Sequence, residues 1–332
     1  MMKKIENTHK YLHDVGLQML NRDFENIWQY LSNDTLLTDN VLDVMRIKLN
    51  EINSFKGVFV DNAIMPDIRE RGSYFEKYEF IENYGMKVTI KKSFIPFLFS
   101  QHFYSTQELG NYIRIFYAFM DKHGIINKAD LKKQGLICNA YNLFLLHGRC
   151  AVETCIKNNY LINDDVVKEL SYAAHYLEDM NESHHASNKP AIFTNHSKFE
   201  KYAKENKECY VVDSISDIPN IPELEETEVR YWSDYKYDRY LNYEYLQNRD
   251  SLDSFCTVCR WIGLISNLFA SGVVDYSTDA RGDRVKWALS SNKKGWDKNL
   301  AQTIPMAQLS VSLFLFTFIA YISTPDTFCF KV

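Results

Sequence analysis

The run Leu309–Ile322, LSVSLFLFTFIAYI, decides the class of fold. Its 14 residues are mostly apolar and include two serines and one threonine. A helix that spans a membrane needs about 20 apolar residues, whereas a run of 10–14 is more typical of a helix buried in a protein core. Pro305 and Pro325 flank the run, so we expect them to bound it. We predict a central core helix, and a helix in contact with lipid is the alternative.

The composition of the whole chain is that of a helical globular protein. Its 332 residues are 46% hydrophobic and 24% charged, so the chain can bury a core without disulfide staples. These values exclude a disordered chain, a collagen and a disulfide scaffold. There are only 12 glycines, and none lies between Arg149 and Ile262. Because tight hairpin turns usually need glycine or asparagine, this spacing favours helices, and we predict a mainly α fold.

Hydrophobic spacing gives the expected elements. Apolar residues at helical intervals predict helices over residues 5–31, from residue 38 and over 136–159, and Asn163 is expected to cap a helix over Asp164–Met180. The N-terminal third also predicts a small β element, with a strand over Gly57–Val60 and a hairpin over residues 75–92. A further short strand is expected near residue 210. An α+β class is therefore the alternative.

A change in composition suggests how the chain is divided. Residues 181–230 contain three of the seven prolines and an acidic run that starts at Asp213. Such a segment is typical of a surface connection between lobes. We predict an N-terminal lobe over 1–180, a polar and acidic connection over 181–230, and a C-terminal helical lobe over 231–332.

Charge and cysteine content bear on partners and compartment. The formal charge is −5, which argues against a protein that coats DNA non-specifically, because such binding relies on neutralising phosphates. The seven cysteines are an odd number and follow no framework pattern, so we expect reduced thiols and a cytoplasmic location. The N-terminus turns polar at once, and we expect no signal peptide and no membrane partner.

Several common catalytic motifs are missing from the sequence. It contains no GxxxxGK[ST] phosphate loop, no GxGxxG dinucleotide fingerprint, no HExxH and no GxSxG elbow. These absences exclude P-loop motors, dinucleotide-binding Rossmann enzymes, zincins and the usual α/β hydrolases.

A histidine cluster is the first group of residues that can carry chemistry. Four of the nine histidines are His175, His184, His185 and His196. If the helix that starts at Asp164 continues far enough, one stripe of it carries four residues of the kinds that bind metals: His175, Glu178, Glu182 and His185. A carboxylate and an imidazole three residues apart on a helix can share a metal, so we consider this stripe a candidate divalent-metal site.

A second segment of the same kind lies near the N-terminus, where Glu6-x-x-His9 is followed by His13 and Asp14. Two such segments on two helices are what a two-metal helical bundle uses. Both segments also fit solvated polar faces near a helix end. We favour that simpler interpretation and expect no cofactor, with a divalent metal as the alternative.

A polar loop is the second candidate site. Three aspartates and two arginines fall close together there and can hold a divalent cation and a phosphate, or simply pair with one another: Asp275, Asp279, Arg281, Asp283 and Arg284.

The segment Arg230–Arg249 is unusually rich in tyrosine. Aromatic and basic residues that alternate in this way can pack within the protein, anchor a protein partner or stack on nucleic-acid bases. The candidate contact residues are Arg230, Trp232, Tyr235, Lys236, Arg239 and Tyr243. From the sequence we predict a soluble interaction protein whose partner is another protein, with nucleic acid as a second class of partner. The alternative function is a metal-dependent hydrolase or nuclease that uses the histidine cluster or the Asp275–Asp283 loop.

Overall fold

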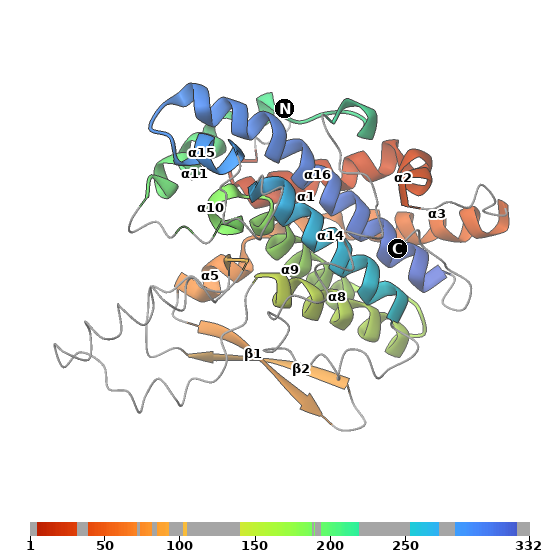
Figure 1. The fold of residues 1–332 in the computed structure, drawn as a ribbon. Helices are drawn as coiled ribbons and strands as arrows, with labels where there is room; N and C mark the ends of the chain where they lie inside the picture. Colours follow the sequence, from red (N-terminus) through yellow and green to blue (C-terminus); the bar gives the residue numbers. More distant parts are fainter. Residues whose placement is uncertain are drawn as a thin grey trace.

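The computed structural model describes residues 5–31, 39–71, 74–81, 85–92, 102–104, 140–187, 189, 194–218, 253–271 and 283–323. Most of these residues are helical, and the predicted mainly α class is confirmed (Figure 1). The long helix α16 (Lys293–Ser323) contacts α1 (Thr8–Arg22), α14 (Asp253–Ser271) and α9 (Asp164–Met180). The other helices are α2 (Phe24–Leu31), α3 (Asp39–Ser54), α4 (Lys56–Asn62), α5 (Met65–Arg71), α8 (Ala140–Lys157), α10 (Ser183–Ala186), α11 (His196–Asn206) and α15 (Asp283–Leu289), with short 3-10 turns η3 (Lys207–Cys209) and η4 (Ile215–Asp217).

The run Leu309–Ile322 forms the buried end of α16, as predicted. Every residue from Thr303 to Ile322 is buried. By length and composition alone α16 is able to cross a membrane, but its burial among the other helices is that of a core helix. Pro305 lies inside α16 and does not bound it, which corrects the expectation. The packing of α16 on every side outweighs the one backbone hydrogen bond that a proline cannot donate.

Polar groups within this core are satisfied locally. The Ser310 hydroxyl donates to the Met306 carbonyl at 2.8 Å, and the Thr317 hydroxyl donates to the Leu313 carbonyl at 2.7 Å. Helix α1 approaches α16 closely at Gly16, where a Cβ atom would lie 2.7 Å from Cγ1 of Val311. Because glycine has no Cβ, it lets the two backbones come this near. This contact fixes α1, and with it the N-terminal histidines, against the core.

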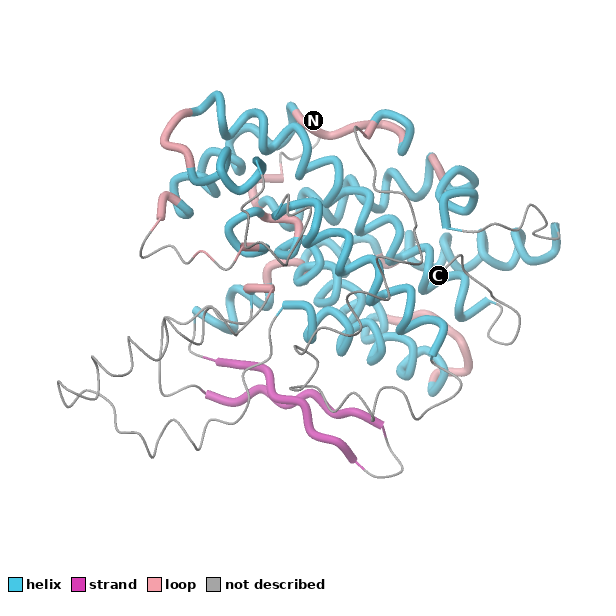
Figure 2. Tube along the Cα trace, viewed as in Figure 1, coloured by secondary structure: helices cyan, strands magenta, loops and turns pink. Residues whose placement is uncertain are grey.

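The β element differs from the expectation in part. Strand β1 (Tyr74–Ile81) pairs antiparallel with β2 (Gly85–Lys92), with Tyr78 opposite Val88, and among the described residues these strands pair only with each other (Figure 2). Residues 57–60 belong to helix α4, and residues 210–212 form no strand. The β element predicted over residues 57–92 is therefore not supported as one unit, because its first part belongs to helix α4, which buries Phe59.

Two helix ends matter for the site. The Asn163 side chain accepts from the Val166 N–H at 3.0 Å and caps α9, as predicted. Helix α9 ends at Met180 and does not reach His185; Glu182 instead caps the separate helix α10. The predicted helix over residues 5–31 is likewise interrupted, at Asp23, between α1 and α2. The three-part division of the chain stays a prediction, since residues 219–252 lie outside the described residues.

Candidate metal centre

Histidines and carboxylates from six segments of the chain gather around the C-terminal half of α9. Within α9, His175 and Asp179 are four residues apart, so both lie on one face of the helix. Helix α11 repeats this spacing with His196 and Glu200. The remaining members come from α1, α5, α10 and the short segment 102–104: His9, Asp67, His185 and His102.

The first centre consists of His102, His175 and Asp179, all buried, with ligand atoms that lie within 4.8 Å of one another. Oδ2 of Asp179 is 2.6 Å from Nδ1 of His102 and 3.3 Å from Nε2 of His175. The other ring nitrogen of His175, Nδ1, lies 2.8 Å from the Ala63 carbonyl oxygen and donates to it. That hydrogen bond assigns the proton of a neutral His175 to Nδ1 and leaves the Nε2 lone pair facing the centre.

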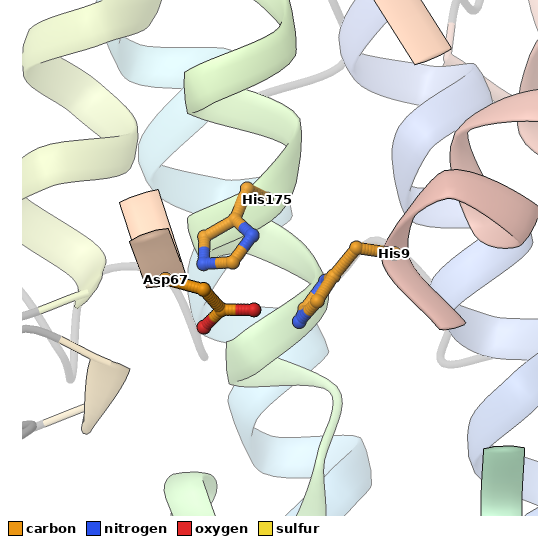
Figure 3. A group of neighbouring side chains, drawn as sticks. All are labelled: His9, Asp67 and His175. Atoms are coloured by element: carbon orange, nitrogen blue, oxygen red, sulfur yellow. The ribbon is translucent and has the colours of Figure 1, made fainter. Parts of the chain in front are cut away.

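His9 and Asp67 lie beside the first centre and share His175 with it. Figure 3 shows the Asp67 carboxylate between the rings of His175 and His9, which reach it from α9 and α1. The two rings are 4.1 Å apart between centroids, and the three ligand atoms again lie within 4.8 Å of one another. His9 Nε2 is also 3.8 Å from Oδ1 of Asp179. One face of α9 thus meets ligands from two elements that are distant in sequence.

The second centre consists of His185, His196 and Glu200. Oε1 of Glu200 is 3.0 Å from Nε2 of His196 and 3.8 Å from Nε2 of His185. His196 is buried, and its Nε2 pairs with Glu200. Oδ1 of Asp179 lies 2.9 Å from Nδ1 of His185. Asp179 therefore contributes Oδ2 to the first centre and, through Oδ1, holds the His185 ring whose Nε2 faces Glu200 in the second centre.

A further group, Glu182, His184 and His196, is close enough to hold an ion but is already committed to other bonds. Glu182 accepts from the His185 N–H at 2.8 Å and lies 2.8 Å from His184 Nδ1. The rings of His184 and His196 stack face to face, 4.7 Å apart and only 1° from parallel. Lone pairs of parallel stacked rings do not converge on one point, so the geometry favours the second centre for His196.

Glu178 lies behind His9. Its Oε2 is 2.7 Å from Nδ1 of His9, and its Oε1 is 2.7 Å from Nδ1 of His13. His13 is fully buried, and its Nε2 lies 3.0 Å from the Ser171 carbonyl oxygen. Glu178 thus bridges two histidines that stand one helical turn apart on α1.

The electrostatics of the cluster favour ionised carboxylates. Burial alone would raise the pKa of Asp179, but the facing His102, His175 and His185 hold that pKa well below its usual value. The pKa values of Asp67, Glu182 and Glu200 are lowered in the same way, by histidines that outweigh the effect of burial. Burial lowers the pKa of His185, yet the nearby Asp179 raises it to about 9.

Glu178 and His13 behave in the opposite way. Burial raises the pKa of Glu178 to about 8 and lowers the pKa of His13 to about 4. A neutral Glu178 next to a neutral His13 costs less in a buried place than an ion pair would. Glu178 and His13 are therefore both neutral, whereas the carboxylates that face the two centres are ionised.

The donors fit a divalent metal. Imidazole nitrogens and carboxylate oxygens are the ligands that zinc and related first-row metals prefer. The histidine and carboxylate side chains of the two centres are buried or nearly so, except Glu200, and each centre combines both donor types. Buried ionised carboxylates are costly unless a cation faces them, and a metal ion is such a cation.

The residues predicted from the sequence have different places in this arrangement. His175, Glu182 and His185 each belong to a group with metal-ligand geometry, and Glu178 contacts His9 and His13. They do not form one helical stripe, because the chain turns between α9 and α10. The expectation of solvated polar faces is wrong for His13, Glu178 and His185, which are buried. In the structure, His9 of the N-terminal segment lies next to the cluster, with Nδ1 2.7 Å from Oε2 of Glu178.

The other two candidate sites lie mostly outside the described residues. This applies to the whole tyrosine-rich segment Arg230–Arg249 and to Asp275, Asp279 and Arg281, which stay predictions. Asp283 and Arg284 are described at the start of α15. The Arg284 guanidinium lies 3.8 Å from the centroid of the Phe269 ring and donates to Oε1 of Gln302 at 2.6 Å. Asp283 pairs with Lys286 at 3.3 Å.

Sequence reasoning missed four members of the two centres and their surroundings: Asp67, His102, Asp179 and Glu200. Two of them carried a usable signal, since His175-x-x-x-Asp179 and His196-x-x-x-Glu200 place a histidine and a carboxylate one helical turn apart. Asp67 and His102 have no local signal, because only the tertiary fold brings them to α9.

Comparisons with known proteins concern the fold. No family model matches this sequence, and no curated protein matches it. The alpha toxin from Clostridium absonum shares the fold with a TM-score of 0.54 and 18% sequence identity, over 97% of this chain and 66% of the toxin. The alpha-toxin of Clostridium perfringens from avian strain SWCP gives a TM-score of 0.52 and 15% identity, over 96% of this chain and 64% of the toxin. This chain therefore spans about two thirds of the length of those toxins, and at such low identity the likeness is one of fold.

Proposed function

We propose that this protein is a metal-dependent hydrolase that cleaves phosphoric esters. The observation that carries the proposal is the position of Asp179, whose two oxygens face the histidines of two adjacent centres. Oδ2 of Asp179 can bind a cation at the first centre, while Oδ1 orients His185, whose opposite nitrogen Nε2 lies 3.8 Å from Glu200 at the second centre. Two histidine and carboxylate groups connected in this way suit two neighbouring cations. The observation favours the hydrolase over the interaction protein that the sequence first suggested.

The ligands of each ion follow from the two centres. His102, His175 and Asp179, with His9 and Asp67 beside them, would hold cations at the first centre. His185, His196 and Glu200 would hold one at the second centre. Divalent cations held in this way would supply Lewis-acid polarisation of a phosphoryl oxygen and a nucleophilic water at neutral pH.

The protein's own residues would prepare the site for this chemistry. The lowered pKa values of Asp179 and Asp67 keep both carboxylates ionised at neutral pH, so no proton has to leave them before a cation binds. The hydrogen bond from His175 to Ala63 holds the ring in the orientation that a ligand needs. Phosphoric esters are the substrate class we propose, because two neighbouring cations stabilise both the attacking and the leaving oxygen of an in-line displacement.

The experiment begins with the metal content of the full chain. Purified protein is analysed for zinc, manganese and iron, then assayed with p-nitrophenyl phosphate and bis(p-nitrophenyl) phosphate, with a peptide p-nitroanilide for comparison. We expect bound metal and hydrolysis of at least one phosphoric ester, loss of that activity on chelation, and recovery when zinc is added. Protein that lacks metal, or activity that survives complete chelation, would overturn the proposal.

A matched pair of variants tests the assignment to Asp179. Asp179→Asn removes the shared charge, whereas Asp165→Asn changes an aspartate on the same helix whose side chain is 74% exposed. We expect Asp179→Asn to lose both metal and activity and Asp165→Asn to keep both. Equal behaviour of the two variants would show that the buried cluster is not the active site.

A further inference from the structure

We infer that Glu178 is a positioning residue, which holds His9 so that its Nε2 faces the first centre. This inference rests on the proposed function, since His9 needs positioning only if it binds a metal. Glu178 was one of the metal ligands suggested by the sequence, but its two oxygens face histidine rings behind the centre. Its role would then be to orient a ligand.

The hydrogen bond to His9 decides the orientation of that ring. Oε2 of Glu178 lies 2.7 Å from Nδ1 of His9. The opposite nitrogen, Nε2, lies 3.8 Å from Oδ1 of Asp179, and His9 forms with Asp67 and His175 a group whose ligand atoms lie within 4.8 Å of one another. Histidines that bind metals usually donate their other ring N–H to a carboxylate or a backbone carbonyl, which fixes both the tautomer and the ring angle. Glu178 provides that acceptor for His9, as the Ala63 carbonyl does for His175.

Glu178 is itself held from behind. Its second oxygen lies 2.7 Å from His13 Nδ1, and His13 Nε2 lies 3.0 Å from the Ser171 carbonyl oxygen. The His13 ring also packs on Phe59, 4.5 Å away between centroids. This chain of contacts runs from the backbone of α9 through α1 and back to Glu178 on α9. These contacts connect α1 with α9 next to His9.

The position of His9 explains why it needs such support. Its side chain is 19% exposed, whereas those of His102 and His175 are at most 3% exposed and are held by their surroundings. His9 lies in the first turn of α1, where helices fray most readily. Without Glu178 the ring would be free to rotate away from the centre.

The experiment measures zinc binding by the full chain with a chromophoric chelator as competitor. Four variants are compared with the unchanged protein: Glu178→Leu, Glu178→Gln, His9→Ala and the double variant His9→Ala with Glu178→Leu. Leucine keeps the volume but not the hydrogen bonds, and glutamine keeps an acceptor for His9. Cobalt(II) spectra serve as a second readout, because they report changes in ligand number.

We expect Glu178→Leu to weaken zinc binding by about 10–100-fold, the usual cost of removing a residue that orients a metal ligand. His9→Ala should weaken it at least as much, and both variants should change the cobalt spectrum in the same way. The double variant should bind zinc no more weakly than His9→Ala, because the two residues act through one ligand. Glu178→Gln should stay close to the unchanged protein.

Other results would overturn the inference. Zinc binding by Glu178→Leu that equals the unchanged protein would show that Glu178 only fills space. A loss in Glu178→Gln as large as in Glu178→Leu would show that the carboxylate itself binds the metal. Should Glu178→Leu fail to fold, His13→Phe replaces it: this variant keeps a ring against Phe59 and removes the support of Glu178, and unchanged zinc binding there would equally overturn the inference. Absence of metal from the unchanged protein would instead reject the proposed function.

Discussion

Two buried regions of this molecule are built in opposite ways. The Leu309–Ile322 part of α16 is packed among apolar side chains, and its few hydroxyls donate mostly to carbonyls of the same helix. The candidate metal centre is also buried, apart from Glu200, but it is lined with histidines and carboxylates that face one another. The first region is stabilised by burying apolar area and needs nothing from outside. In the second, the cost of burying carboxylates is offset by the histidines that face them, and a bound cation would offset it further.

Helix α9 takes part in both regions. Its buried leucines, Leu170 and Leu177, belong to the main hydrophobic core, whereas His175 and Asp179 face the metal centre. One helix thus connects the hydrophobic core to the candidate ligands. Substitutions in the core should mainly lower the free energy of unfolding, and substitutions in the candidate centre should mainly weaken metal binding.

The largest effect on metal binding is expected from Asp179→Asn, because Asp179 contacts histidines of both centres. Asp179→Asn should reduce metal binding at both centres, whereas Glu200→Gln should reduce it at the second centre alone. Asp179 is a candidate ligand of the first centre and also orients His185 of the second. Because the loss of an orienting residue alone costs about 10–100-fold in affinity, the loss of Asp179 should cost at least that much. Metal analysis after dialysis measures both variants. An Asp179→Asn protein that loses only as much metal as Glu200→Gln would contradict a role of Asp179 at both centres.

The core gives the next largest effect. Phe318→Ala removes a fully buried ring from α16 and should destabilise the protein by roughly 3–5 kcal/mol, through lost burial and the cavity that remains. Metal binding below the melting temperature should be unchanged. Ile47→Ala, at a position that is 57% exposed, is the control and should have little effect. Thermal unfolding and metal analysis together test the independence of the two regions, which a loss of metal in folded Phe318→Ala would disprove.

A third test uses pH on the metal-free protein. The pKa of His185 is raised to about 9, so the stability from its pairing is complete below about pH 6.5, its value in the unfolded chain, and is lost as pH rises through 9. Glu178, with its pKa raised to about 8 by burial, acts in the same direction, because the folded state keeps a proton that the unfolded state releases.

We therefore expect the melting temperature of the metal-free protein to fall between about pH 6 and pH 9. Zinc should raise the melting temperature more at about pH 8 than at pH 6, since metal and protons compete for the same histidines. Calorimetric melts with and without zinc measure both trends. A melting temperature that rises over this range in the metal-free protein would contradict the ionisation states given for the cluster.

The smallest effect concerns α15, outside both regions. Arg284→Ala removes the contact with the Phe269 ring and should cost about 0.5–2 kcal/mol of stability without loss of metal. Lys286→Ala, at an exposed neighbouring position, is the control and should change little. If Arg284→Ala loses metal or activity while it stays folded, the polar loop would have to be counted with the site.

The sequence predicted the apolar region better than the polar one, for a physical reason. The burial of Leu309–Ile322 and the cap at Asn163 follow from local patterns, so both could be predicted from neighbouring residues. The centre depends on contacts between distant segments, and Asp67 and His102 have no neighbours in sequence that would mark them as ligands. Where a local signal did exist, as in His175-x-x-x-Asp179, a helical spacing of four was the feature to search for.

The order of the ligands along the chain has a consequence for how the molecule folds. His175, Asp179, His185, His196 and Glu200 belong to one short segment, whereas His9 is 169 residues away from its partner Glu178. Closing a short loop costs less entropy than closing a long one. During refolding in the presence of zinc, the segment from α9 to α11 can therefore gather its ligands early. If zinc binds as proposed, we expect the N-terminal helix to dock after that segment, and a slow kinetic phase would report the arrival of His9.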